Sequence, residues 1–183
     1  DIPPLTVSTS KVDILCFGNG DGSAEAIGEG GVPPYTYSWT PSGATAETIN
    51  NLSGGQYTVT VTDAWNKTAT ATVTITEPTQ LVSNLVHTPV SCNGQNNGSA
   101  TVAPSGGVAP YTVLWSDNTI GNTKNNLSPG TYSVTIRDAN HCVLTETFTI
   151  TEPTVLTSVV SSQTNVTAYG GNDGSATITV TGG

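Results

Sequence analysis

Residues that could do chemistry are few and isolated in this sequence. Its two histidines, His87 and His141, belong to no His-Glu-x-x-His or similar metal-binding pattern. A Gly-x-Ser-x-Gly nucleophile elbow is absent, and the glycines at 18–22 and 170–174 fit hairpin turns rather than a phosphate-binding loop. Because a catalytic site needs convergent acids, bases or a metal, the sequence predicts no enzymatic activity.

Four loop aspartates are the candidate metal ligands: Asp21, Asp63, Asp138 and Asp173. Carboxylates in loops suit Ca²⁺, but no EF-hand spacing is completed. The Asp-Gly and Asp-Ala pairs are also explained by turn chemistry alone. We therefore expect no cofactor, with Ca²⁺ at these aspartates as the alternative.

The charge of the chain argues against two classes of partner. The formal net charge is −9, and the 4 basic residues are scattered singly, so no basic patch could neutralise phosphates. No apolar run approaches the roughly 20 residues of a membrane span. The sequence predicts neither nucleic-acid binding nor membrane insertion.

An internal repeat is the strongest signal, with a shift of about 76 residues. The shift brings Cys16 onto Cys92, Trp39 onto Trp115, and, after one deletion, Thr76-Glu77-Pro78 onto Thr151-Glu152-Pro153. A third copy begins with Asp173-Gly174-Ser175-Ala176 and is incomplete. We therefore predict domains at 1–79 and 80–154 and the start of a third repeat at 155–183, as in an excerpt from a longer array.

Within each copy the apolar residues alternate with threonines, as in Tyr57–Thr62 and Thr68–Thr76. Nothing has helical spacing. We predict an all-β chain of tandem Ig-like β-sandwich repeats of about 75 residues. Trp39 and Trp115 should lie in the cores. Tyr57 and Tyr132, each after a glycine turn, should form tyrosine corners.

The three cysteines invite a disulfide, and the repeat alignment selects a pair. Cys92 and Cys142 lie in the same copy. In the first copy, which contains Cys16, the position equivalent to Cys142 is Lys67. We predict a Cys92–Cys142 bond and a Cys16 that is a small buried apolar residue.

The ordered motifs of the copies resemble a known family. The series Cys-x-Gly, Asx-Gly-Ser-Ala, Gly-Gly-x-x-Pro-Tyr, Leu-Ser-x-Gly-x-Tyr, Asp-Ala-x-x-Cys and Thr-Glu-Pro is similar to the SprB-type repeat of surface adhesins of gliding bacteria. The full pattern runs from Cys92 to Pro153, and the first and third copies depart from it at Lys67 and Ala168. The resemblance implies very long surface proteins of Bacteroidetes-type bacteria, exported by a type IX system and moved during gliding, with no catalytic residues in the repeats.

Together these features predict a stalk segment of an extracellular adhesin at the bacterial cell surface, projecting a distal binding element. The short joints at 77–79 and 152–154 contain proline, which fixes φ, so neighbouring domains should align into a semi-rigid rod. The expected partners are neighbouring repeats, with surface polysaccharide or other adhesin subunits as further candidates.

Two alternatives remain open. One is a carbohydrate-binding module of a secreted protein. Its only aromatic candidate is Trp65, which occupies a turn position that is Asn140 in the next copy. The other is a self-assembling surface fibre subunit, in which the third copy exchanges a strand with a neighbour.

Overall fold

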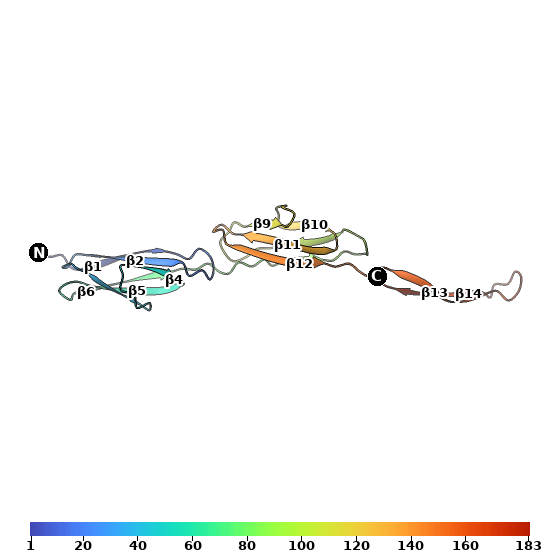
Figure 1. The fold of residues 1–183 in the computed structure, drawn as a ribbon, viewed down its shortest axis with the longest axis horizontal. Helices are drawn as coiled ribbons and strands as arrows, with labels where there is room; N and C mark the ends of the chain where they lie inside the picture. Colours follow the sequence, from blue (N-terminus) through green and yellow to red (C-terminus); the bar gives the residue numbers. More distant parts are fainter. The chain divides into compact units, whose positions relative to one another are not determined.

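The computed structural model describes residues 1–183 and consists of 14 strands joined by turns and loops, without a helix (Figure 1). The predicted all-β class is confirmed. No helix of the chain has the length and apolar character needed to cross a membrane.

The chain divides into two compact units, which are described separately. Unit 1 contains the first sequence copy and three short segments of the second, within the ranges Asp1–Val82, Pro104–Tyr111 and Arg137–Leu144. Unit 2 contains the rest: Ser83–Ala103, Thr112–Ile136 and Thr145–Gly183.

The first copy forms two antiparallel three-stranded sheets. One has the order β1-β2-β4, with β1 at Thr6–Val12, β2 at Gly22–Glu29 and β4 at Thr48–Leu52. The other has the order β3-β5-β6, with β3 at Thr36–Thr40, β5 at Gly55–Thr62 and β6 at Thr68–Ile75. The alternation predicted for β5 is confirmed, because Tyr57, Val59 and Val61 are buried and the threonines between them are partly exposed.

The second copy repeats this topology in the orders β7-β8-β10 and β9-β11-β12. Its strands are β7 at Val86–Thr88, β8 at Gly98–Thr101, β9 at Thr112–Trp115, β10 at Thr123–Leu127, β11 at Gly130–Arg137 and β12 at Val143–Ile150. The core keeps its positions and changes its residues: Val61 and Val73 of the first copy become Ile136 and Phe148, and all four are buried. Each of these two copies is thus an Ig-like sandwich of about 75 residues, as predicted.

The third copy is a single hairpin in this chain. Strand β13, Thr157–Thr164, pairs antiparallel with β14, Ser175–Thr181. Every residue of both strands is exposed, including Val160 and Ile178.

Both tyrosine corners form. The hydroxyl of Tyr57 donates to the carbonyl oxygen of Ser53 at 3.0 Å, and that of Tyr132 donates to Ser128 at 2.9 Å. A second pair was not predicted: the hydroxyls of Tyr35 and Tyr111 each donate to a glycine carbonyl five residues earlier. Each of the first two copies therefore has two tyrosines that brace loops.

Candidate functional site

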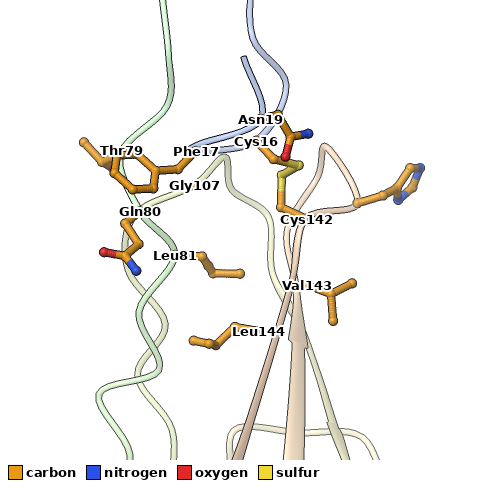
Figure 2. Close-up of a pocket in the computed structure, with 11 residues that line it drawn as sticks. Cys16, Phe17, Asn19, Thr79, Gln80, Leu81, Gly107, Cys142, Val143 and Leu144 are labelled. Atoms are coloured by element: carbon orange, nitrogen blue, oxygen red, sulfur yellow. A yellow bond between two sulfur atoms is a disulfide. The ribbon is translucent and has the colours of Figure 1, made fainter. Parts of the chain in front are cut away.

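The disulfide of this chain joins Cys16 to Cys142, with the Cα atoms 5.6 Å apart (Figure 2). Cys92 is a free, exposed cysteine. The predicted Cys92–Cys142 bond and the predicted unpaired Cys16 are therefore both wrong. The bond connects the first sequence copy to the second, and both cysteines belong to unit 1.

The position of strand β12 between the two cysteines explains the error. The loop of Cys92 is bound beyond the last residue of β12, because Asn93 and Gly94 hydrogen-bond to Pro153 and Glu152. Cys142 directly precedes the first residue of β12. An extended eight-residue strand spans about 27 Å, whereas bonded cysteines have Cα atoms less than about 7 Å apart. The alignment placed both cysteines in one copy but did not place them at one end of its strands.

Each cysteine of the bond is held by its own turn. The backbone N–H of Gly18 donates to Glu77 Oε1 at 2.6 Å, which fixes the Cys16 loop against the Thr-Glu-Pro motif. The backbone N–H of Cys142 donates to Asp138 Oδ1 at 2.9 Å. The side-chain amide of Asn140 donates to the carbonyl oxygen of Leu15 at 2.9 Å, beside the disulfide.

A hollow of about 470 Å³ lies next to the cystine. Figure 2 shows its wall, which comprises Phe17 from the Cys16 loop, Leu144 at the start of β12, and Thr79, Gln80 and Leu81. We call this region of unit 1 the joint, because it contains the link between the first two copies. Its wall includes one ionisable side chain, His141, and no acidic side chain.

A pair of glycines anchors the joint, and the same contact occurs in all three copies. In each copy the backbone N–H of the second glycine donates to a backbone carbonyl oxygen. The pairs are Gly31 to Pro3 at 2.9 Å, Gly107 to Thr79 at 2.7 Å and Gly183 to Thr154 at 3.0 Å. The glycine before each donor has positive φ and lies so close to the chain that a Cβ atom would approach a carbonyl oxygen to 2.2 Å or less. Only glycine fits there, so the Gly-Gly motif is a structural requirement of the joint.

The candidate calcium ligands serve turns instead of meeting at one site. Asp63 Oδ1 accepts hydrogen bonds from the backbone N–H groups of Trp65 and Lys67, and its Oδ2 accepts one from Val32. Burial by itself would raise the pKa of Asp63, but these backbone donors outweigh it and hold the pKa below its usual value. Asp138 accepts the equivalent bonds from Cys142 and Val108.

The other two aspartates act within their own hairpins. Asp21 accepts a hydrogen bond from the Asn19 amide. Asp173 accepts bonds from the hydroxyl and N–H of Thr167, which lower its pKa. The chain has no group of three or more His, Cys, Asp or Glu side chains that could hold a metal ion.

Two of the three tryptophans lie in the cores, as predicted. Trp39 and Trp115 are buried at 0% and 2% exposure, and their indole N–H groups donate to Ala46 and Gly121. Trp65 is 61% exposed. It lines a hollow together with Ile2, Pro3, Leu5 and Lys67. It is one of two accessible aromatic side chains of the first copy, with Phe17.

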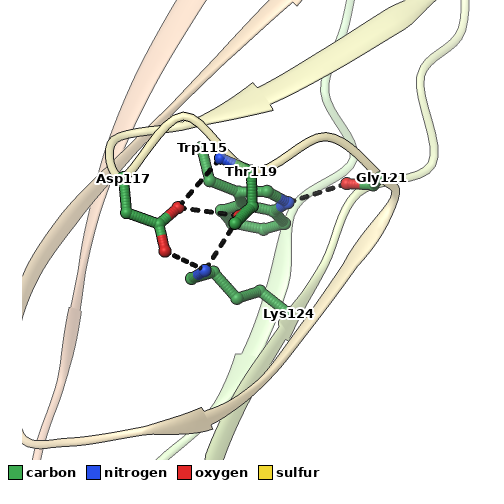
Figure 3. Close-up of polar contacts among 5 residues, drawn as sticks. All are labelled: Trp115, Asp117, Thr119, Gly121 and Lys124. Atoms are coloured by element: carbon green, nitrogen blue, oxygen red, sulfur yellow. Dashed lines mark hydrogen bonds and ion pairs between the residues drawn. The ribbon is translucent and has the colours of Figure 1, made fainter.

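Sequence reasoning missed a polar cluster beside Trp115 (Figure 3). Lys124 bonds to Asp117 and to the hydroxyl of Thr119, and Asp117 also accepts the Thr119 hydroxyl at 2.7 Å. The Lys124 ammonium and the Thr119 hydroxyl lower the pKa of Asp117 to about 2. The sequence offered one signal for this cluster. Lys124 is one of only four basic residues, and it lies seven positions after Asp117 of the Ser-Asp-Asn turn.

The two histidines lie in different settings, and neither forms an ion pair. His87 stacks on Phe148, with the ring centroids 5.4 Å apart. His141 occupies the turn before Cys142 with a φ of 66°.

Comparison with solved structures finds distant similarities. The C-terminal 282-residue fragment of intimin, solved with the intimin-binding domain of its translocated receptor, shares 14% identity; the match covers 86% of this chain and 66% of that one, at a TM-score of 0.43. An amphioxus IgVJ-C2 molecule shares 14% identity over 79% of this chain and 96% of its own, at 0.34. A tetra-tandem repeat from the extending region of a large adhesion protein shares 14% identity over 97% of this chain and 62% of its own, at 0.24.

Comparison with curated proteins finds no match. The family model described as SprB repeat matches three times, at residues 8–44, 84–120 and 160–183. These matches fall on the three sequence copies and together cover more than half of the chain. The chain therefore belongs to the SprB repeat family.

Proposed function

We propose that this chain is a structural stalk segment of a repetitive bacterial cell-surface adhesin. The observation that carries the proposal is the joint. The same Gly-Gly contact recurs in all three copies, and between the first two it is reinforced by the Cys16–Cys142 bond. The residues that recur in the copies form backbone contacts and a disulfide at the joint, whereas a catalytic protein needs side chains that converge in a cleft.

The proposal includes repeats at 1–79, 80–154 and 155–183 that act as spacers and catalyse no reaction. In it, the protein is extracellular, is exported by a type IX system, and projects a distal element used in gliding or adhesion. Neighbouring repeats are the main partners, and surface polysaccharide or other adhesin subunits are the external ones. Membership of the SprB repeat family supports this assignment.

Small-angle X-ray scattering on the oxidised chain tests the spacer role. A compact globule of this length has a radius of gyration of about 16 Å. A stalk segment should give a value well above that, unchanged when the protein is diluted. A value close to the globular one would contradict the stalk, and a value that rises with concentration would favour the fibre subunit.

A carbohydrate-binding module is the second candidate, and the exposure of Trp65 favours it. A glycan screen of the chain and its Trp65→Ala variant separates the two functions. The stalk proposal expects no glycan binding by either protein and no turnover of ester, peptide or glycan substrates. Tight binding by the unsubstituted chain that the variant loses would establish the binding module.

A further inference from the structure

Unit 2 contains a second hollow built like the joint. It has a volume of about 320 Å³, and Cys92 lies in its wall. Asn93, Thr154, Leu156 and Gly183 also line it. They are the repeat equivalents of Phe17, Thr79, Leu81 and Gly107, which line the hollow beside Cys16. The surroundings of the free cysteine therefore match those of a bonded one.

The loop of Cys92 also has the conformation of the bonded loop. The carbonyl oxygens of Cys16 and Cys92 each accept a backbone hydrogen bond at 3.1 Å from the residue three positions later. Gly94 donates to Glu152 as Gly18 donates to Glu77. The φ values of these two glycines are 75° and 81°. The backbone around Cys92 thus has the same conformation as the backbone around the bonded Cys16.

The other half of such a joint is an Asp-Ala-x-x-Cys turn from the following copy. Cys142 supplies it for Cys16. The third copy contains only β13 and β14 here, and its core face is uncovered. Ile178 is 61% exposed, whereas its equivalents Ala26 and Val102 are 0% and 1% exposed. Strands equivalent to β9, β11 and β12 would cover this face and bring the turn between the last two strands to Cys92.

We infer that Cys92 forms a disulfide with the Asp-Ala-x-x-Cys cysteine of the repeat completed on β13 and β14. The two thiols lose two protons and two electrons to an oxidising disulfide, such as oxidised glutathione, which is reduced to two thiols. The inference deepens the proposed function, on whose tandem array it rests. A joint would be covalent where the following copy has cysteine and non-covalent where it has lysine, as at Lys67.

The test extends the full chain after Gly183 with a copy of its own residues 108–154. The appended copy carries His141→Gln, so that its cysteine peptide differs in mass from the native one. After refolding with oxidised glutathione, peptide mapping without reduction should find Cys92 linked to the appended cysteine and Cys16 still linked to Cys142. Alkylation of Cys92, nearly complete in the unextended chain, should be lost.

The matched control replaces the appended cysteine with lysine, the residue of the first copy, and should leave Cys92 open to alkylation. Hydrogen exchange at 157–181 reports whether the appended copy has covered the hairpin. Protected amides with a free Cys92, or a link from Cys92 to another cysteine, would overturn the inference. Unprotected amides would overturn it too, because its first step is completion of this sheet. An unlinked Cys92 would leave the stalk proposal standing, since scattering tests that separately.

Discussion

Cys16 and Cys142 are bonded across 126 positions of the sequence. The bond closes a covalent loop around residues 17–141, which include most of both sandwiches. A pull on the two ends of the chain passes through the two sulfur atoms and bypasses the residues between them. The loop therefore stays under no end-to-end tension while the bond is intact.

Single-molecule stretching from the two termini should show this protection. Reduction releases 126 positions into the tensioned path, which adds about 440 Å of extended chain at about 3.5 Å per residue. Without reductant, the unfolding trace should lack this length. The Cys16→Ser variant should behave like the reduced protein and Cys92→Ser like the oxidised one. Equal final lengths with and without reductant would show that the bond does not carry the load.

The tyrosine corner of the second copy should contribute measurably to stability. Tyr132→Phe removes the hydroxyl that donates to Ser128 and keeps the ring, so it should lower the unfolding free energy by about 1 kcal/mol. Urea unfolding measures the change. The matched control is Tyr169→Phe, because Tyr169 is fully exposed and should tolerate the change. Equal stability of the two variants would mean that the corner contributes nothing.

The fold was readable from the sequence because its signal is local and repeated. The alternation in β5 follows from side chains that point to opposite faces of a sheet, and it predicted which residues are buried. The Gly-Gln-Tyr and Gly-Thr-Tyr segments likewise predicted both tyrosine corners. Such patterns depend only on neighbours along the chain, so no knowledge of packing is needed to recognise them.

The joint could not be predicted from the sequence, because its contacts link segments that are far apart along the chain. Aligning the copies showed that Cys92 and Cys142 share one repeat. Only the structure shows that the length of β12 separates them. The role of Glu77 was missed for the same reason, since its partner Gly18 lies 59 residues away. The motifs of the joint could be recognised in the sequence, whereas the contacts between them could be identified only from the structure.

The buried and exposed tryptophans should differ sharply in their effect on stability. Trp115→Ala removes a core side chain that is 2% exposed and should lower the unfolding free energy of the second copy by about 3–5 kcal/mol. Trp65→Ala, at 61% exposure, should change stability little. Thermal unfolding followed by circular dichroism compares them. A large loss in Trp65→Ala would mean that this ring supports the fold.

The cluster of Asp117 and Lys124 should make the second copy sensitive to acid. The pKa of Asp117 is about 2 in the folded chain, below the ordinary value of 3.8, so the folded state favours the ionised carboxylate. Its stabilising contribution is fully present above about pH 4 and is lost as the pH falls towards 2. Over this range, the unfolding temperature of the unsubstituted chain should fall more steeply than that of Asp117→Asn.

The variant Lys124→Gln provides the matched comparison, because it removes the partner and keeps the carboxylate. It should flatten the acid response over the same pH range, and adding Asp117→Asn to it should change little further, since the two residues act as a pair. The indole N–H signal of Trp115, followed by NMR, reports the cluster locally because this ring lies beside it. Some acid response should persist in every variant, because hydrogen bonds also lower the pKa of Asp13, Asp63 and Asp173. Acid curves that run parallel in the unsubstituted chain and in all three variants would show that the ion pair contributes nothing to the stability of the fold.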